Sequence, residues 1–152
     1  MSGDNARRVD LSWTGRARFR ATNARGGTIE LGTGEDTDFT PVELLLVAIA
    51  GCSAADVDLI TGKRSDPASF EVVATGNKIR DDLGNRLVDL ALDFQVRFPD
   101  DEGGQRAEQV LERSVRQSHD RLCTVTRTVE VGSPVSASIR GVQVIPPVPE
   151  LS

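Results

Sequence analysis

The segment from Thr40 to Gly62, TPVELLLVAIAGCSAADVDLITG, constrains the fold of this chain more than any other. Thr40 suits an N-cap and Pro41 suits the first helical position. Glu43 completes a capping box with Thr40, and Gly62 ends the pattern. Residues 44–50 are apolar on nearly every side of the expected helix. Because such a helix must be covered all round, we expect it to be buried at the centre of the fold.

The residues before this helix predict an antiparallel meander. Apolar residues alternate with polar ones at 9–13 and again at 17–21, which is typical of a half-buried hairpin. Arg16, Arg18 and Arg20 would share its polar face. A turn at 25–27 then leads into a third strand at 28–31.

The second half of the chain predicts further strands and a second helix. Strands are expected at residues 70–75 and 88–98, the latter with Val88, Leu90, Leu92, Phe94, Val96 and Phe98 on one core-facing side. Helical spacing from Ala107 to Leu122 predicts a helix that ends near Cys123. A last strand is expected at 125–131, with a continuation to residue 139 and a tail from 141. The prediction is one α+β domain over residues 1–152, with extended or flexible tails at 1–6 and 141–152.

Charge and composition limit the binding partners that this chain is expected to have and the cellular compartment in which it is expected to occur. The chain has 152 residues and a net charge of −5, which argues against a nucleic-acid or anionic-membrane surface. The N-terminus lacks the apolar stretch of a signal peptide, and we find no run of about 18 apolar residues. We therefore expect a soluble, cytoplasmic protein.

Cys52 and Cys123 are the two residues with the most distinctive chemistry. A permanent disulfide is not expected in the cytoplasm, which leaves reactive thiols or inert buried ones. Their places at the two expected helices favour a dithiol pair, in which one sulfur attacks and the other resolves. No metal or cofactor is expected, because there is no CxxC pair and the single histidine, His119, has few companions.

The segments TPVELLLVAIAGCSAADV and SHDRLCTVTRTV resemble the two signature segments of the OsmC/Ohr family, and the resemblance extends over essentially the whole chain. It implies an intertwined homodimer with two long central helices back to back and active sites at the subunit interface. It also implies that an organic hydroperoxide oxidises Cys52 to a sulfenic acid, which Cys123 resolves as a disulfide. A dithiol, such as a lipoylated protein, would then reduce the enzyme.

The same resemblance implies that an N-terminal arginine paired with a glutamate activates the attacking thiol. Arg16 is the best positional match, although it can also be explained as a solvated strand arginine beside Arg18 and Arg20, and Arg64 is a second candidate. Glu43 is displaced by one position from the family's glutamate, where this chain has Val42. The capping box already accounts for Glu43, and this departure favours the general OsmC-like branches.

Asp56, His119 and Ser53 lie near the cysteines in sequence, and each can be explained without a role in catalysis. A carboxylate at Asp56 would raise the pKa of a thiol if it pointed at the sulfur. We expect it instead to face solvent or to pair with Lys63 or Arg64. His119 could serve as a base for Cys123 or have only a structural role. Ser53 has no base partner in the sequence, so a serine hydrolase is not expected.

The leading prediction is thus a thiol peroxidase. The alternative is an OsmC-like domain without peroxidase turnover that binds or senses a small hydrophobic or electrophilic ligand at the dimer interface. A structural dimer with inert thiols is the third alternative.

Overall fold

The computed structural model describes residues 5–147, which form two compact units. One unit extends to Val47 and the other begins at Ala48, within the long helix α1.

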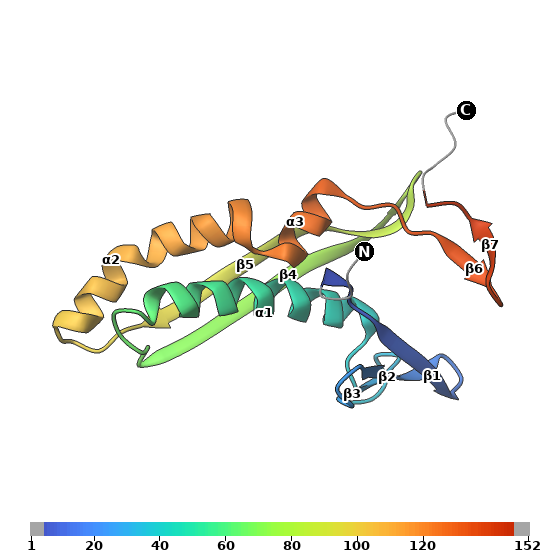
Figure 1. Cartoon of the computed structure of the whole chain (residues 1–152), viewed down its shortest axis with the longest axis horizontal. Helices are drawn as coiled ribbons and strands as arrows, with labels where there is room; N and C mark the ends of the chain where they lie inside the picture. Colours follow the sequence, from blue (N-terminus) through green and yellow to red (C-terminus); the bar gives the residue numbers. More distant parts are fainter. Residues whose placement is uncertain (1–4, 148–152) are drawn as a thin grey trace. The chain divides into compact units, whose positions relative to one another are not determined.

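The N-terminal unit contains the predicted meander. Its strands β1 (Val9–Gly15), β2 (Arg18–Asn23) and β3 (Thr28–Leu31) pair antiparallel in that order (Figure 1). Arg18 forms ion pairs with Asp36 and Asp38 in the loop that follows β3. The apolar side of the sheet is largely uncovered in a single chain, with these exposed fractions: Val9 63%, Leu11 53%, Trp13 70%.

Helix α1 (Pro41–Thr61) begins and ends where the sequence predicted. The Thr40 N–H donates to Glu43 Oε1 at 2.9 Å, and the Glu43 N–H donates to Thr40 Oγ1 at 3.2 Å. This reciprocal pair confirms the capping box. At the other end, the Gly62 N–H donates to the Asp58 carbonyl at 2.8 Å.

Burial of α1 within one chain is less complete than predicted. A single stripe at a spacing of four residues is buried: Ile49, Ser53, Val57 and Thr61. Leu45, Val47 and Leu59 remain exposed, the last at 71%. The chain therefore covers one side of the helix, because residues four apart share a face.

By length and composition alone, α1 is apolar enough to cross a membrane, with a mean hydropathy of 1.9 over its best 18-residue window. The sequence has no uninterrupted run of about 18 apolar residues, but the mean hydropathy of this window is high enough although it includes polar residues. Core helices of soluble proteins meet the same criterion, so it does not by itself indicate a membrane protein.

In the C-terminal unit, strands β4 (Ser69–Asp81) and β5 (Gly84–Arg97) form a long antiparallel hairpin. The strands extend beyond the predicted ranges because their polar ends also pair. Asn77 lies opposite Val88 whereas Thr75 lies opposite Ala91, so β5 has one extra residue and a bulge. Asp89 takes a positive φ of 54° there.

The bulge interrupts the uniform alternation that the sequence predicted for β5. Leu92, Phe94 and Val96 keep a shared, half-buried side. Leu90, beside the bulge, is 37% exposed instead. The predicted core-facing side therefore holds only for the later part of the strand, because one extra residue reverses the alternation.

Helix α2 (Glu102–Gln117) continues into a short π-helix, η2 (Ser118–Leu122), and then helix α3 (Thr124–Val131). The side chain of Asp101 caps α2 by accepting the Gly104 N–H at 2.7 Å. The predicted second helix ending near Cys123 is confirmed. The predicted strand at 125–131 is wrong, since these residues form α3.

The β-branched content of α3 explains this error, because Val and Thr favour strands by propensity. Local bonds favour the helix instead. Thr128 Oγ1 donates to the Thr124 carbonyl at 2.7 Å, and the Cys123 sulfur caps the first turn.

The end of the described chain forms a separate hairpin of β6 (Ala137–Ile139) and β7 (Val142–Ile145). The predicted continuation to residue 139 is therefore a strand, but it pairs with β7 and does not extend the β4–β5 hairpin. Residues 142–145, predicted as part of a tail, belong to this hairpin. The outer parts of both predicted tails, 1–4 and 148–152, lie outside the described residues. Within the described range the α+β class is confirmed.

Candidate active site

The two cysteines lie together in the C-terminal unit. Cys52 lies on α1, and Cys123 lies at the junction of η2 and α3. Their sulfurs and a carboxylate oxygen of Asp56 all lie within 4.8 Å of one another. Both thiols are free, with Cys52 half-buried and Cys123 fully buried. The predicted dithiol pair is therefore present as a spatial cluster.

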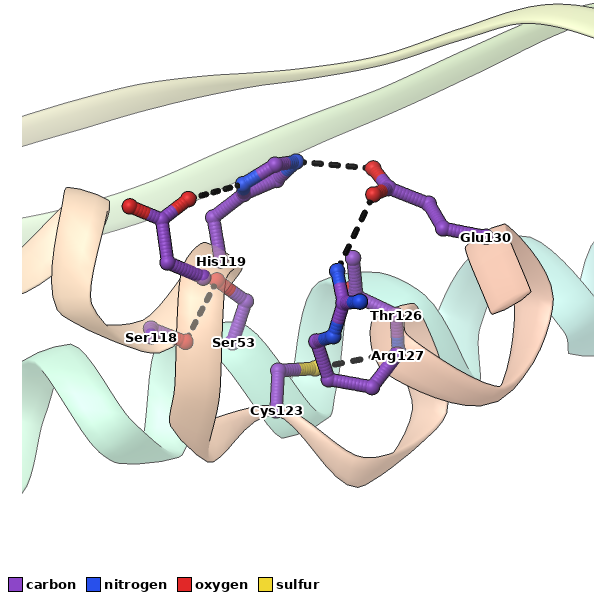
Figure 2. A network of polar contacts seen from close by, with 8 residues as sticks. Ser53, Ser118, His119, Cys123, Thr126, Arg127 and Glu130 are labelled. Atoms are coloured by element: carbon purple, nitrogen blue, oxygen red, sulfur yellow. Dashed lines mark hydrogen bonds and ion pairs between the residues drawn. The ribbon is translucent and has the colours of Figure 1, made fainter.

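The π-helix fixes the position of Cys123. The Cys123 N–H donates to the Ser118 carbonyl at 2.8 Å, five residues back, and this bond closes η2. Cys123 is then extended, with φ −73° and ψ 100°, and becomes the N-cap of α3. Its sulfur accepts the Thr126 N–H at 3.4 Å, as Figure 2 shows.

Asp56 points toward the thiols, contrary to the prediction that it faces solvent or pairs with Lys63 or Arg64. It lies one turn after Cys52 on the same side of α1. The Ser118 hydroxyl donates to Asp56 Oδ2 at 2.9 Å. The Arg64 guanidinium instead donates to the Ile60 carbonyl at 3.4 Å.

Two buried serines extend this contact into a chain of hydrogen bonds. The Oγ atoms of Ser53 and Ser118 are 3.1 Å apart, and the bond joins α1 to η2 (Figure 2). Because the carboxylate of Asp56 can only accept hydrogen bonds, the Ser118 hydroxyl uses its one hydrogen in the bond to Asp56. The Ser53 hydroxyl is therefore the donor in the bond to Ser118. The chain therefore runs from Ser53 through Ser118 to Asp56.

The surroundings favour the neutral thiol of Cys52. Burial raises its pKa most, and the Cys123 thiol and the Asp56 carboxylate raise it further. The Val125 N–H, directed at the sulfur, lowers the pKa. No cationic side chain of the described part of the C-terminal unit contributes to this balance.

The other predicted site residues have separate positions. Arg16 lies in the exposed turn between β1 and β2, outside the strand where it was predicted, and makes none of the ion pairs found among residues 5–147. Glu43 caps α1, and the Thr40 N–H and hydroxyl lower its pKa. Both belong to the N-terminal unit, so their action on Cys52 stays a prediction.

Arg64, the second candidate for activating Cys52, follows the C-terminal end of α1. Thr61 is nine residues after Cys52 on α1, a distance of about 14 Å at 1.5 Å per residue. With its guanidinium on the Ile60 carbonyl, Arg64 does not act on Cys52 within this unit.

His119 has a structural role and does not contact Cys123. Its Nδ1 lies 2.8 Å from Asp120 Oδ1 and its Nε2 lies 2.8 Å from Glu130 Oε1. Asp120 and then Glu130 raise its pKa. Figure 2 shows the ring directed toward Glu130 and away from the Cys123 sulfur. His119 thus connects η2 to α3.

Sequence reasoning missed Asp56 and Ser118 as members of the site. The spacing of four between Cys52 and Asp56 was a usable signal, because it places both on one face of a helix. Ser118 gave no such signal, since its position depends on the π-helical turn.

A family model described as OsmC-like protein matches residues 33–138. An uncharacterized protein of Mycobacterium tuberculosis is 30% identical over 129 residues, covering 83% of this chain and 90% of that protein. An OsmC-like protein of unknown function from Vibrio cholerae has a similar structure, with a TM-score of 0.65, 15% identity, and coverage of 83% and 94%. The organic hydroperoxide resistance protein OhrB of Bacillus subtilis matches with a TM-score of 0.55, 14% identity, and coverage of 81% and 90%.

At 15% and 14% sequence identity, these two structural matches show a shared fold only. The family model and the mycobacterial relative match the amino-acid sequence, and each match extends over more than half of the chain. The chain belongs to the OsmC/Ohr family, as an OsmC-like protein.

Proposed function

We propose that this protein reduces organic hydroperoxides with Cys52 as the attacking thiol and Cys123 as the resolving thiol. The observation that carries the proposal is the approach of the two sulfurs to within 4.8 Å, from separate helices, in a protein with free thiols. A disulfide needs about 2.05 Å between the sulfurs. A small movement of the η2–α3 junction or a rotation of the side chains covers the difference.

The reaction conserves atoms and electrons through two steps. The Cys52 thiolate attacks the terminal oxygen of ROOH, which gives the sulfenic acid and, after protonation, ROH. The Cys123 thiol then attacks the sulfenic sulfur, which forms the disulfide and releases water. Exchange with an external dithiol, such as a lipoylated protein, restores both thiols.

Differences in burial support these two roles. Cys52 is half-buried and so within reach of a substrate, whereas Cys123 is fully buried and can meet only a sulfur already oxidised inside the site. An attacking thiol must also be ionised, and the C-terminal unit alone raises the pKa of Cys52. We therefore propose that Arg16 supplies the missing positive charge, from the same chain or from a partner. Glu43 would position it.

We further propose a soluble, cytoplasmic homodimer. The exposed apolar side of β1, with Trp13 70% exposed, and the exposed side of α1, with Leu59 71% exposed, support a partner subunit. Such side chains on a soluble protein mark an interaction surface.

The test is consumption of cumene hydroperoxide by the purified protein with excess dihydrolipoamide, alongside Cys52→Ser and Cys123→Ser. We expect no turnover with Cys52→Ser, and a trappable sulfenic acid in Cys123→Ser. Absence of turnover by a folded wild-type dimer would refute the proposal. Arg16→Gln, with Arg25→Gln as a control in a neighbouring turn, tests the activating role. Only the former is expected to shift the pH profile of Cys52 alkylation upward.

One observation favours the alternative, a dithiol that traps or senses an electrophilic ligand without peroxidase turnover. Asp56 holds a negative charge at the thiols and raises the pKa of Cys52, which slows attack on any electrophile. Slow attack limits repeated peroxidase turnover more than it limits a single trapping reaction. In that case the protein would form a stable adduct with an electrophile such as N-ethylmaleimide at Cys52, and hydroperoxide would remain unconsumed.

A further inference from the structure

We propose that the reduced protein binds Zn²⁺ at a site formed by the thiolates of Cys52 and Cys123 and the carboxylate of Asp56. This site is independent of peroxidase turnover, because it needs only the reduced dithiol and the geometry of the C-terminal unit. The sequence did not predict it, since Asp56 was expected to face elsewhere.

The distances fit a tetrahedral ion. With about 2.3 Å for Zn–S and about 2.1 Å for Zn–O, a tetrahedral site requires about 3.8 Å between sulfurs and about 3.6 Å between sulfur and oxygen. The three atoms already lie within 4.8 Å of one another. The sulfur–sulfur distance therefore needs to contract by at most about 1.0 Å and each sulfur–oxygen distance by at most about 1.2 Å, which is within the reach of side-chain rotation.

The protein around the three groups fixes their directions. Cys52 and Asp56 lie one turn apart on α1, and Cys123 is fixed as the N-cap of α3. Ser118 donates to Asp56 Oδ2 at 2.9 Å and Ser53 supports Ser118, which leaves Oδ1 for an ion. A hydrogen bond that orients a ligating carboxylate is usual around protein-bound metals.

A cation would also suit the three groups electrostatically, because two thiolates and a carboxylate together place three negative charges in one small volume. Among residues 5–147, the groups that counter this charge are neutral donors: the Val125 N–H toward Cys52, the Thr126 N–H toward Cys123 and the Ser118 hydroxyl toward Asp56. A divalent ion would displace the two thiol protons and leave a net charge of −1. Sulfur ligands with one carboxylate select Zn²⁺ over Mg²⁺ or Ca²⁺.

No fourth His, Cys, Asp or Glu of residues 5–147 joins the cluster. The fourth position is therefore open to water or to an external ligand, as in zinc sites that retain an exchangeable position. Because a disulfide removes both thiolates, oxidation would release the ion. If the proposed peroxidase reaction also occurs, bound Zn²⁺ protects the dithiol from hydroperoxide.

The test is an anaerobic titration of the reduced full-length protein with Co²⁺, followed by displacement with Zn²⁺. We expect one equivalent of Co²⁺ with a thiolate charge-transfer band and the visible bands of a tetrahedral ion. Asp56→Asn keeps the size and the hydrogen bond from Ser118, and is expected to weaken binding by about 100-fold or more, because the loss of a ligand should reach at least the upper end of the range seen for outer-shell changes. Asp58→Asn, an exposed change on the same helix, is the matched control and is expected to bind as the wild type does.

Ser118→Ala is expected to weaken Co²⁺ binding by about 10-fold, because it removes the orienting bond. Circular dichroism of each variant establishes that it is folded. Equal affinity of Asp56→Asn and Asp58→Asn, or binding without a thiolate band, would overturn the proposal. No hydroperoxide is present in this experiment, so its outcome is separate from that of the peroxidase assay.

Discussion

Replacing Ser118 by alanine tests the hydrogen-bonded chain that joins α1 to η2. The change removes the donor to Asp56 and the acceptor for Ser53. A hydrogen bond to a charged group contributes about 1.5–3 kcal/mol, and the lower end applies because Asp56 is only half-buried and can bind water. Ser53 is 3% exposed, and its hydroxyl loses its bond to Ser118 at a cost of about 1 kcal/mol or more. The expected loss in the free energy of unfolding is therefore about 2.5 kcal/mol.

For a chain of this size, that loss corresponds to a decrease in Tm of about 5–10 °C. Urea and thermal unfolding followed by circular dichroism measure it, at one fixed protein concentration because the stability of the proposed dimer would depend on concentration. Ser114→Ala is the matched control. Ser114 is equally buried, but its hydroxyl donates only to the Leu111 carbonyl of its own helix at 2.6 Å. We expect that control to lose about 0.5 kcal/mol or less.

A double-mutant cycle of Ser53→Ala and Ser118→Ala isolates the bond between the two serines. We expect a coupling energy of about 1 kcal/mol, since the residues are in direct contact. The reasoning would be refuted if the Ser118 and Ser114 variants lost equal stability, or if the cycle gave no coupling.

Three further predictions concern other parts of the chain. A Cβ at Gly104 would lie 1.8 Å from the Pro99 carbonyl oxygen, so Gly104→Ala should destabilise the protein by about 1–3 kcal/mol in urea unfolding. A variant as stable as wild type would contradict this. Since its carboxylate partners raise the pKa of His119, its stabilising contribution should be complete below about pH 6.5 and be lost as the pH rises through the folded value. His119→Gln should abolish that part of the pH dependence, and an unchanged profile would contradict the assignment. Thr40→Ala should cost about 1 kcal/mol while leaving Cys52 alkylation unchanged, whereas a change in alkylation would indicate that the cap acts on the thiol.

The parts of the fold that sequence predicted were those in which local signals agree. Thr40, Glu43 and Gly62 delimit α1, and period-two alternation delimits the meander. The segment 125–131 was predicted wrongly because the propensity of its β-branched residues opposed a helix whose cap is a cysteine sulfur. The bulge at Asp89 was invisible in sequence, because one inserted residue leaves a plausible alternation on either side.

The candidate site was predicted in part. Both cysteines were identified, and the structure brings them together. Asp56 was assigned to solvent because its partner, Ser118, is 62 residues away in sequence and is brought to it by a π-helical turn. Helical spacing indicates which residues share a face, but not which distant element packs against that face.

Cys123 is both a candidate reactive residue and the N-cap of α3, so a change at its sulfur affects the backbone at the start of that helix. One sulfur atom accepts the Thr126 N–H and is also the atom that meets Cys52. When that sulfur forms a covalent or metal bond, its lone pairs are redirected, and the hydrogen bond from the Thr126 N–H changes in geometry and strength. The hydrogen-exchange rate of the Thr126 amide should therefore depend on the redox state of the dithiol. It can be measured by NMR on the protein without substrate.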